Sequence, residues 1–317
     1  MATMRLTSLL VLQSLCCVIA LKQSPDPPRH AYITMAHDEE DTHGVNLLRT
    51  LPVVHALRKV TDRQIIVMTN ATQFGDGTSV RDAFGKMSVD VWPIHPVDIP
   101  EEFLTRKYMA KCKAKCGFTF FKLQAWRFTQ FDKLIMFDTD AIVTRNFDDF
   151  FELPGTWAQE ERWWCKPTGF MSGGFVILEP SERDYQGMMR FANTEDIPAA
   201  DQSTISGYFG VGGQVDESQL MLVRTLSGYF NASSLRHRVQ LIDKEKVDYG
   251  MCLDAHPEGP PPFVHKSDRN NHCFTIAPSA LTPECKRHRL GALYRQHLCE
   301  ATATLGIAFD ERDQYCG

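Results

Sequence analysis

The sequence predicts an α/β fold with a mostly parallel central sheet flanked by helices. Short apolar runs, typical of buried strands, alternate along the chain with segments of helical spacing, as in parallel sheets joined by crossover helices. The composition, 43% hydrophobic and 23% charged residues in a chain of 317, is that of a folded globular protein. The net charge of -5 does not favour a nucleic-acid partner.

Five apolar runs are the expected strands; two of the four helical patterns fall between them, and two follow the last one. The strands are expected at residues 31–36, 64–69, 89–92, 133–137 and 174–178. The helices are expected at residues 45–59, 120–131, 182–193 and 217–228. We therefore expect one α/β domain over residues 31–272, after a Pro-rich linker over residues 21–30. A cysteine-rich tail over residues 273–317 is expected to pack on this domain.

Residues 1–20 have the pattern of a secretory signal peptide. Arg5 precedes an apolar run that is shorter than a membrane span, and Val18 and Ala20 are small residues at the −3 and −1 positions of a cleavage site. The alternative is an uncleaved anchor, and only in that case is a membrane contact expected. Asn-X-Ser/Thr triplets at Asn70 and Asn231 agree with a secretory chain. The expected location is the Golgi lumen or the cell exterior.

The cysteines support the same compartment. The chain has ten, and Cys16 and Cys17 lie in the predicted signal peptide, so eight remain. An even number of cysteines in a secretory chain indicates disulfides, whose pairing cannot be deduced from the sequence. The alternative for Cys112 and Cys116 is a zinc site, but no second pair of suitable spacing follows.

Asp138-Thr139-Asp140 directly follows the expected strand at 133–137. Ligands of parallel α/β sheets bind beyond the carboxyl ends of the strands. Two carboxylates at such an edge can bind a divalent cation through oxygen. The alternative is a solvated turn, but apolar residues on both sides place the acids in a partly buried setting.

The segment Phe121–Val143 around these acids resembles the central motif of glycosyltransferase family 8, which includes glycogenin and galactinol synthase. Four further segments match that family in order, and together they span roughly residues 30–270: Ala31–Ala36, Ser172–Ser181, an Asp-Gln-type motif and Phe263–His265. The resemblance implies a GT-A fold. It also implies a UDP-sugar donor and transfer with retention of configuration at the anomeric carbon.

The resemblance implies a metal site and a set of donor contacts. Mn²⁺, with Mg²⁺ as the alternative, would be bound by Asp138, Asp140 and His265. Two carboxylates and one imidazole suit Mn²⁺ better than Ca²⁺. The donor would contact Ala31, Thr34, Ala36, Lys122, Asp138, Thr139, Ser172, Gly173, Gly174 and Lys266.

The family's acidic motif has two candidates, and either would orient the hydroxyls of the donor sugar. Asp201 is followed by Gln202, as in the family, but the next residues are Ser, Thr and Gly types that suit a loop. Asp216 opens a better helical pattern, so the sequence favours Asp216. Together with Lys122, these two residues are the catalytic candidates.

Two departures from the family leave room for another function. Met171 stands where the family has Asn, and the Lys-Pro-Trp that follows the family's histidine is missing after His265. We expect a retaining transferase that moves a hexosyl-type sugar to a glycan, a protein or a small polyol. The alternative is a non-catalytic protein of the same fold that binds a nucleotide sugar or a carbohydrate. A nucleotidyltransferase is disfavoured because residues 36–44 contain only Gly44 where it needs a glycine-rich phosphate loop.

Overall fold

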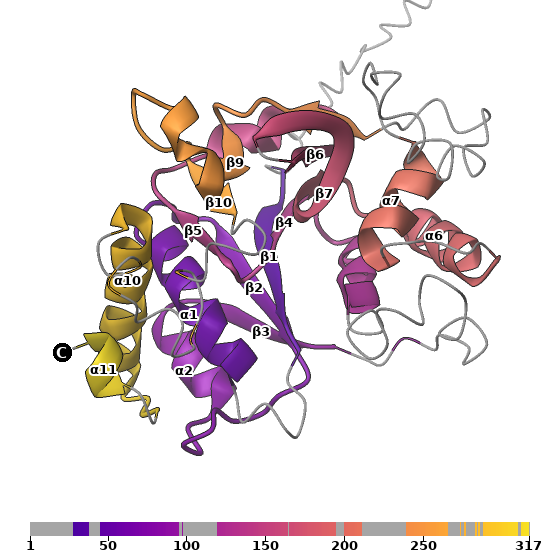
Figure 1. Ribbon diagram of the computed structural model, residues 1–317. Coiled ribbons are helices and arrows are strands. Elements are labelled where there is room, and N and C mark those ends of the chain that lie inside the picture. Colours follow the sequence, from indigo (N-terminus) through magenta and orange to yellow (C-terminus); the bar gives the residue numbers. More distant parts are fainter. Residues whose placement is uncertain are drawn as a thin grey trace, which may run out of the picture.

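The chain forms two β-sheets, and helices lie on both sides of the larger one (Figure 1). A computed structural model describes residues 28–37, 45–94, 97, 119–163, 165–194, 200–210, 239–265, 273, 276, 283, 285, 288–309 and 312–316. Outside these residues lie the predicted signal peptide, most of the linker, the predicted helix at 217–228, Cys112, Cys116, Asn231, Asp216 and Lys266. The larger sheet has seven strands in the order β3-β2-β1-β4-β7-β6-β8.

Four neighbouring strands of the larger sheet are parallel. They are β1 (His30–Ala36), β2 (Gln64–Thr69), β3 (Asp90–Pro93) and β4 (Lys133–Phe137). β1 and β4 are almost wholly buried, because continuous apolar runs form strands that are covered on both faces. The predicted strands in this region are confirmed to within one residue.

The other three strands of this sheet are β6 (Trp157–Trp163), β7 (Lys166–Leu178) and β8 (Gln240–Ile242). β7 is antiparallel to both β4 and β6. The prediction found only the last five residues of β7, because residues 166–173 lack an apolar run. β6 was missed because its centre is polar.

A small second sheet has the order β5-β10-β9. Its strands are β5 (Ala141–Val143), β9 (Val247–Tyr249) and β10 (Phe263–His265). β10 is antiparallel to β5 and parallel to β9, and His265 lies opposite both Ala141 and Tyr249. This sheet begins directly after the Asp-Thr-Asp segment.

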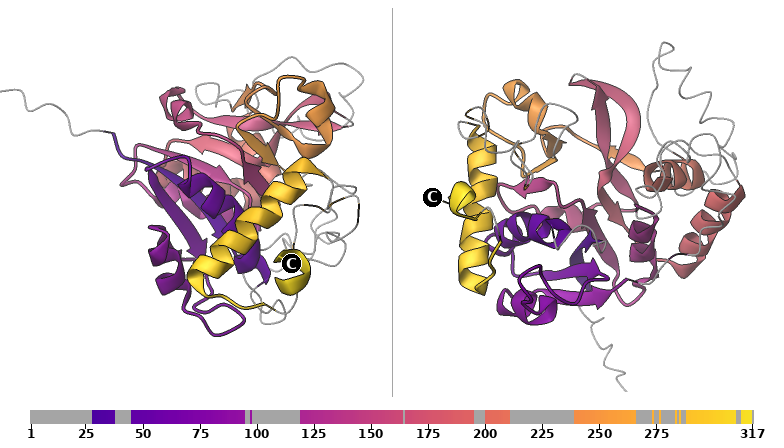
Figure 2. Two further views of the ribbon diagram at one scale, coloured as in Figure 1. Left: turned by 90° about the vertical axis from the view of Figure 1, so that its left-hand side faces the viewer. Right: turned by 60° about the horizontal axis from the view of Figure 1, so that its bottom comes forward.

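Helices cover both faces of the larger sheet, and each face has its own apolar core (Figures 1 and 2). One core includes residues of α1 (Val45–Arg58), α2 (Val80–Lys86) and α10 (Arg289–Leu305). The other includes residues of the 3-10 helix η2 (Phe120–Arg127), α6 (Glu182–Thr194) and α7 (Ala200–Phe209). Two further 3-10 helices, η3 (Asp148–Glu152) and η6 (Gly250–Ala255), connect strands. No helix in the described part of the chain is long and apolar enough to cross a bilayer.

Asp201 lies in a helix, and the prediction that it lies in a loop was wrong. It is in the first turn of α7. The small polar residues after it do not break the helix, because the hydroxyl of Ser206 donates to the carbonyl of Gln202, one turn earlier, over 2.7 Å.

The C-terminal segment shares the core of the main domain. Leu290, Tyr294 and Leu298 of α10 are buried in the same cluster as residues of α1. Figure 2 shows α10 lying along the flank of the molecule, with α11 (Arg312–Cys316) beside it. Disulfides Cys273–Cys285 and Cys299–Cys316 join parts of this segment to each other. The boundary at residue 273 stays a prediction.

Candidate active site

Asp138, Asp140 and His265 meet where the two sheets adjoin. Asp138 follows β4, Asp140 precedes β5, and His265 ends β10. The Nε2 atom of His265 lies 3.2 Å from Oδ1 of Asp140 and 3.8 Å from Oδ2 of Asp138. One ligand atom from each residue lies within 4.8 Å of the others. The pairing of β5 with β10 therefore brings a distant histidine to the two acids.

Gln159 fixes the orientation of the histidine ring. Its Oε1 lies 3.1 Å from Nδ1 of His265, and the side chain is fully buried on β6. An amide oxygen only accepts, so Nδ1 donates to it and Nε2 faces the two carboxylates. Burial lowers the pKa of His265, but the carboxylates of Asp140 and Asp138 outweigh this and raise it above its usual value. The negative potential that holds a proton here would equally attract a cation.

Lys122 connects the acids to helix α7. Its Nζ lies 2.6 Å from Oδ1 of Asp138 and 3.2 Å from Oδ2 of Asp201. Burial lowers the pKa of Lys122, but these two carboxylates more than offset it and raise the pKa, so the ammonium stays charged. Burial raises the pKa of Asp138; Lys122 opposes this rise, whereas Asp140 adds to it.

Gly173 and Gly174 let the backbone of β7 approach both sides of the site. A Cβ at Gly173 would lie 2.9 Å from Oδ2 of Asp201, and one at Gly174 would overlap the ring of His265. The amide of Asp138 donates to the carbonyl of Gly174 over 3.0 Å. Gly174 is therefore required for the close approach of the backbone to His265, and Gly173 leaves room for the carboxylate of Asp201.

Two more predicted donor contacts lie beside these groups, and a third lies at the same sheet edge. Thr139 is half-buried between the two acids. The buried hydroxyl of Ser172 accepts from the amide of Gly174 over 3.2 Å. Ala36 is the last residue of β1, at the carboxyl edge of the parallel strands.

Of the remaining predicted contacts on β1, Thr34 lies opposite Phe137, directly before Asp138, and Ala31 lies three residues earlier. Thr34 is fully buried, and its hydroxyl donates to the carbonyl of Phe137 over 2.7 Å. Ala31 pairs with Leu134 at the opposite end of the strand, so the structure does not bring it to the acids. Met171, which replaces the family's Asn, is fully buried in an apolar core.

Tyr249 also borders the site and was not predicted. Its ring centroid lies 5.4 Å from that of His265, and its hydroxyl donates to Oε2 of Glu161 over 3.1 Å. Burial raises the pKa of Tyr249, and the carboxylate of Glu161 raises it further. The sequence carries no signal for it, because the residues before it, Lys-Glu-Lys-Val-Asp, form neither an apolar run nor a motif.

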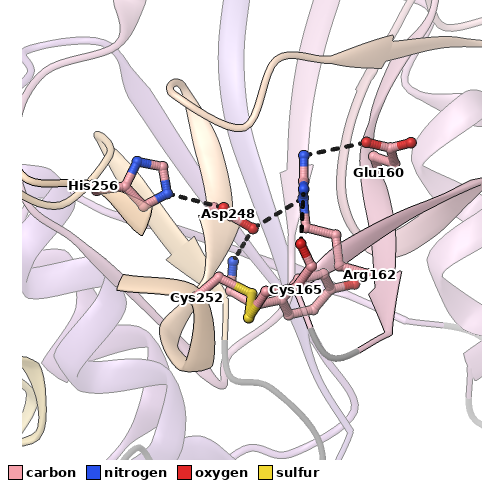
Figure 3. The surroundings of a disulfide bond; sticks show 7 residues. Glu160, Arg162, Cys165, Asp248, Cys252 and His256 are labelled. Atoms are coloured by element: carbon pink, nitrogen blue, oxygen red, sulfur yellow. Dashed lines mark hydrogen bonds and ion pairs between the residues drawn. A yellow bond between two sulfur atoms is a disulfide. The ribbon is translucent and has the colours of Figure 1, made fainter. Parts of the chain in front are cut away.

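A buried ionic network and a disulfide hold Tyr249 and its strand in place (Figure 3). Asp248 is 1% exposed and lies between Nε of Arg162, at 3.2 Å, and Nε2 of His256, at 2.9 Å. The Cys165–Cys252 disulfide links the β6–β7 connection to η6, just after β9. Both links fix β9 against β6, the strand that carries Gln159.

Comparisons with known proteins find glycosyltransferases. No family model matches the chain. Glycogenin-1 of Caenorhabditis elegans is 29% identical over 182 residues, which cover 56% of this chain and 39% of the relative. Glycogenin-1 of Oryctolagus cuniculus is 30% identical over 188 residues, covering 59% and 52%. UDP-glucuronate:xylan alpha-glucuronosyltransferase 2 of Arabidopsis thaliana is 25% identical over 165 residues, covering 51% and 24%. The chain thus spans about half or less of the length of these relatives.

Solved structures share the fold at low sequence identity. The bifunctional glycosyltransferase WbbM superposes with a TM-score of 0.53 at 10% identity, over 92% of this chain and 51% of WbbM. The glycosyltransferase GlyE of Streptococcus pneumoniae has a TM-score of 0.50 at 16% identity, over 88% and 63%. The glycogenin relatives therefore support the resemblance to glycosyltransferase family 8, and the chain has the GT-A fold of solved glycosyltransferases.

Proposed function

We propose that the chain is a metal-dependent retaining glycosyltransferase of the secretory pathway. It would transfer a hexosyl-type sugar from a UDP-sugar to a glycan, a protein or a small polyol. The observation that carries the proposal is the convergence of Asp138, Asp140 and His265 beside the Lys122–Asp201 ion pair. The printed name of the Arabidopsis relative, which states a UDP-sugar donor, supports the donor class.

The side chains at the site fit a Mn²⁺ ion. Two carboxylates and an imidazole are ligands that Mn²⁺ accepts, with Mg²⁺ as the alternative. Gln159 leaves Nε2 of His265 directed at the carboxylates, as a metal ligand requires. When bound, the ion would neutralise the charge that develops on the departing diphosphate.

The chain's own residues would bind and orient the donor. Lys122 stays charged and holds Asp138 and Asp201 in fixed positions. Asp201, next to the backbone of Gly173, is our choice for the acid that orients the sugar hydroxyls. The sequence alone favoured Asp216, but the ion pair with Lys122 supports Asp201.

Backbone and small side chains complete the proposed donor site. Thr139, Ser172 and Gly174 border the acids, and Ala36 lies at the same sheet edge. Lys266 follows His265 directly, and we propose that it contacts the diphosphate. Retention of configuration is carried over from the family.

The test is hydrolysis and transfer across a panel of UDP-glucose, UDP-galactose, UDP-xylose, UDP-GlcNAc and UDP-glucuronate with Mn²⁺. We expect slow hydrolysis of one donor and Mn²⁺-dependent thermal stabilisation by UDP. Asp138→Ala and Asp140→Ala should remove both, whereas Asp82→Ala, on the exposed face of α2, should change neither. UDP stabilisation that survives both substitutions without metal would place the site elsewhere. Binding without any turnover would favour the non-catalytic alternative.

The secretory location has its own support and test. The Cys165–Cys252, Cys273–Cys285 and Cys299–Cys316 disulfides suit an oxidising compartment, and Asn70 of the Asn-Ala-Thr triplet is exposed. Expressed in cultured cells, the chain should carry an N-glycan that peptide N-glycosidase F removes. Asn70→Gln should abolish or reduce the resulting mobility shift. A chain that stays in the cytosol without any glycan would contradict the location and leave the enzyme activity untouched.

A further inference from the structure

A second group of metal-binding side chains lies between helices α1 and α10. Two such groups gather in the described part of the chain, and this one is formed by His55, His297 and Glu300. His55 is near the end of α1, and the other two residues are three positions apart on α10, which places them on one helix face. One ligand atom from each lies within 4.8 Å of the others.

The two imidazoles face each other through the same kind of ring atom. Nδ1 of His55 lies 3.0 Å from Nδ1 of His297. A single shared proton accounts for that distance, because one neutral ring can donate to the other. This hydrogen bond does not involve the carboxylate of Glu300. That carboxylate forms an ion pair with Lys59 at the solvent-exposed edge of the cluster. The cluster thus combines two imidazoles, one carboxylate and one exposed ammonium.

We propose that His55, His297 and Glu300 form a second cation site, for Zn²⁺ or a similar borderline divalent ion, that fastens α10 to α1. Two imidazoles and one carboxylate are ligands that Zn²⁺ prefers. Nitrogens 3.0 Å apart are spaced as neighbouring ligands of one ion, given metal–nitrogen bonds of about 2.0–2.1 Å. The carboxylate of Glu300 would turn away from Lys59 and bind the ion. Water would occupy the fourth coordination position of the ion.

The surroundings keep the ligands in the forms that bind a cation. Burial, helped by the nearby charges of His55 and Lys59, lowers the pKa of His297 to about 4. Burial also lowers the pKa of His55. Hydrogen bonds from Lys59 and Gln296 lower the pKa of Glu300 to about 2. At neutral pH both rings are therefore uncharged, and an ion that binds both Nδ1 atoms would displace their shared proton to Nε2 of the donor ring.

The site is accessible from solvent, and its ligands come from distant parts of the chain. The side chain of Glu300 is 37% exposed and that of Lys59 is 50% exposed, so an ion can enter without unfolding. His55 and His297 are 242 positions apart. An ion held between them would close a very long loop and stabilise the docking of the C-terminal helix.

The test is Zn²⁺ binding in a chain whose first site is disabled. In the Asp138→Ala/Asp140→Ala background, isothermal titration with Zn²⁺ should give one site per chain, and Zn²⁺ should raise the melting temperature. Adding His297→Gln or Glu300→Gln should weaken binding by about 100-fold and about 10-fold, respectively. His30→Gln, a histidine on β1 outside both groups, is the matched control and should leave binding unchanged.

A variant with the opposite effect makes the test sharper. Lys59→Met removes a positive charge from the mouth of the site, so Zn²⁺ affinity should rise by roughly 5-fold. The proposal is overturned if the background chain binds no Zn²⁺, which leaves the histidines as a hydrogen bond only. It is also overturned if His297→Gln and Glu300→Gln bind as tightly as the background. Circular dichroism confirms that each variant is folded, and Glu300→Gln still decides the question if His297→Gln is not.

Discussion

The parallel half of the larger sheet and the region around β6 and β9 are stabilised in different ways. In the first, strands β1 and β4 bury residues such as Ile33, Leu134 and Met136, which are at most 1% exposed. In the second, a carboxylate, a guanidinium and an imidazole are buried together, and a disulfide closes the connection. The hydrophobic effect needs no precise partner, whereas buried charges must each be paired.

The candidate site takes one part from each region. Asp138 follows a strand of the apolar half, and His265 is held by Gln159 and Tyr249 from the charged region. We therefore expect substitutions in the ionic network to displace His265 while Asp138 and Asp140 keep their positions. Substitutions that shorten buried side chains in the apolar half should lower the free energy of unfolding of the whole domain.

The largest effect is expected from breaking the ionic network. Asp248→Leu removes the carboxylate between Arg162 and His256 and leaves the buried Arg162 with Glu160 alone, so we expect a loss of about 3–5 kcal/mol in the free energy of unfolding. Leu134→Ala in the apolar half should cost about 2–5 kcal/mol. Urea unfolding measures both, and Mn²⁺ titration of the folded variants should show weaker binding for Asp248→Leu alone.

A double variant separates charge from packing in this comparison. Arg162→Met with Asp248→Leu should recover part of the lost stability, because an apolar pair can replace a buried ion pair. The free energy of unfolding is measured for Arg162→Met, for Asp248→Leu and for the double variant. If the double variant loses more than the sum of the two single losses, the unpaired buried charges are not what destabilises the single variants.

The next largest effect is expected from the disulfides. Cys165→Ser/Cys252→Ser opens a loop of 87 residues and should cost about 4 kcal/mol, whereas Cys299→Ser/Cys316→Ser opens one of 17 and should cost about 3 kcal/mol. Thermal unfolding measures both losses. Only the first pair should also weaken Mn²⁺ binding, since it fixes β9 beside His265. Equal Mn²⁺ affinity in the two variants would contradict the link between that disulfide and the site.

The same contrast explains what could be predicted from the sequence. The parallel strands were predicted because runs such as Leu134–Phe137 are continuously apolar. β6 was missed because residues 159–162, Gln-Glu-Glu-Arg, are polar, and their partners come from other strands. Asp138 and Asp140 were found as a motif. Gln159 could not be found, because its role depends on how β6 packs against the small sheet that carries His265.

A smaller effect is expected from Gln159. Gln159→Leu removes the acceptor for Nδ1 of His265, so Mn²⁺ affinity should fall by about 10–100-fold, as for other partners that orient a ligating histidine. Gln159→Glu keeps an acceptor oxygen at the same place and should retain most of the affinity. Isothermal titration with Mn²⁺ measures both. Equal losses in the two variants would mean that packing, and not the hydrogen bond, holds the ring.

The smallest effect is expected at an exposed ion pair. Nε of Arg127 lies 3.4 Å from Oε2 of Glu182, and both side chains are about half exposed, at 47% and 49%. Glu182→Gln should therefore cost less than about 1 kcal/mol, and the difference should shrink in high salt because water and ions already screen the charges. Arg127 would keep its contact with the ring of Tyr185, 5.2 Å away. Urea unfolding at low and high salt checks this. If Glu182→Gln costs as much as Asp248→Leu, burial of charge is not what distinguishes the two regions.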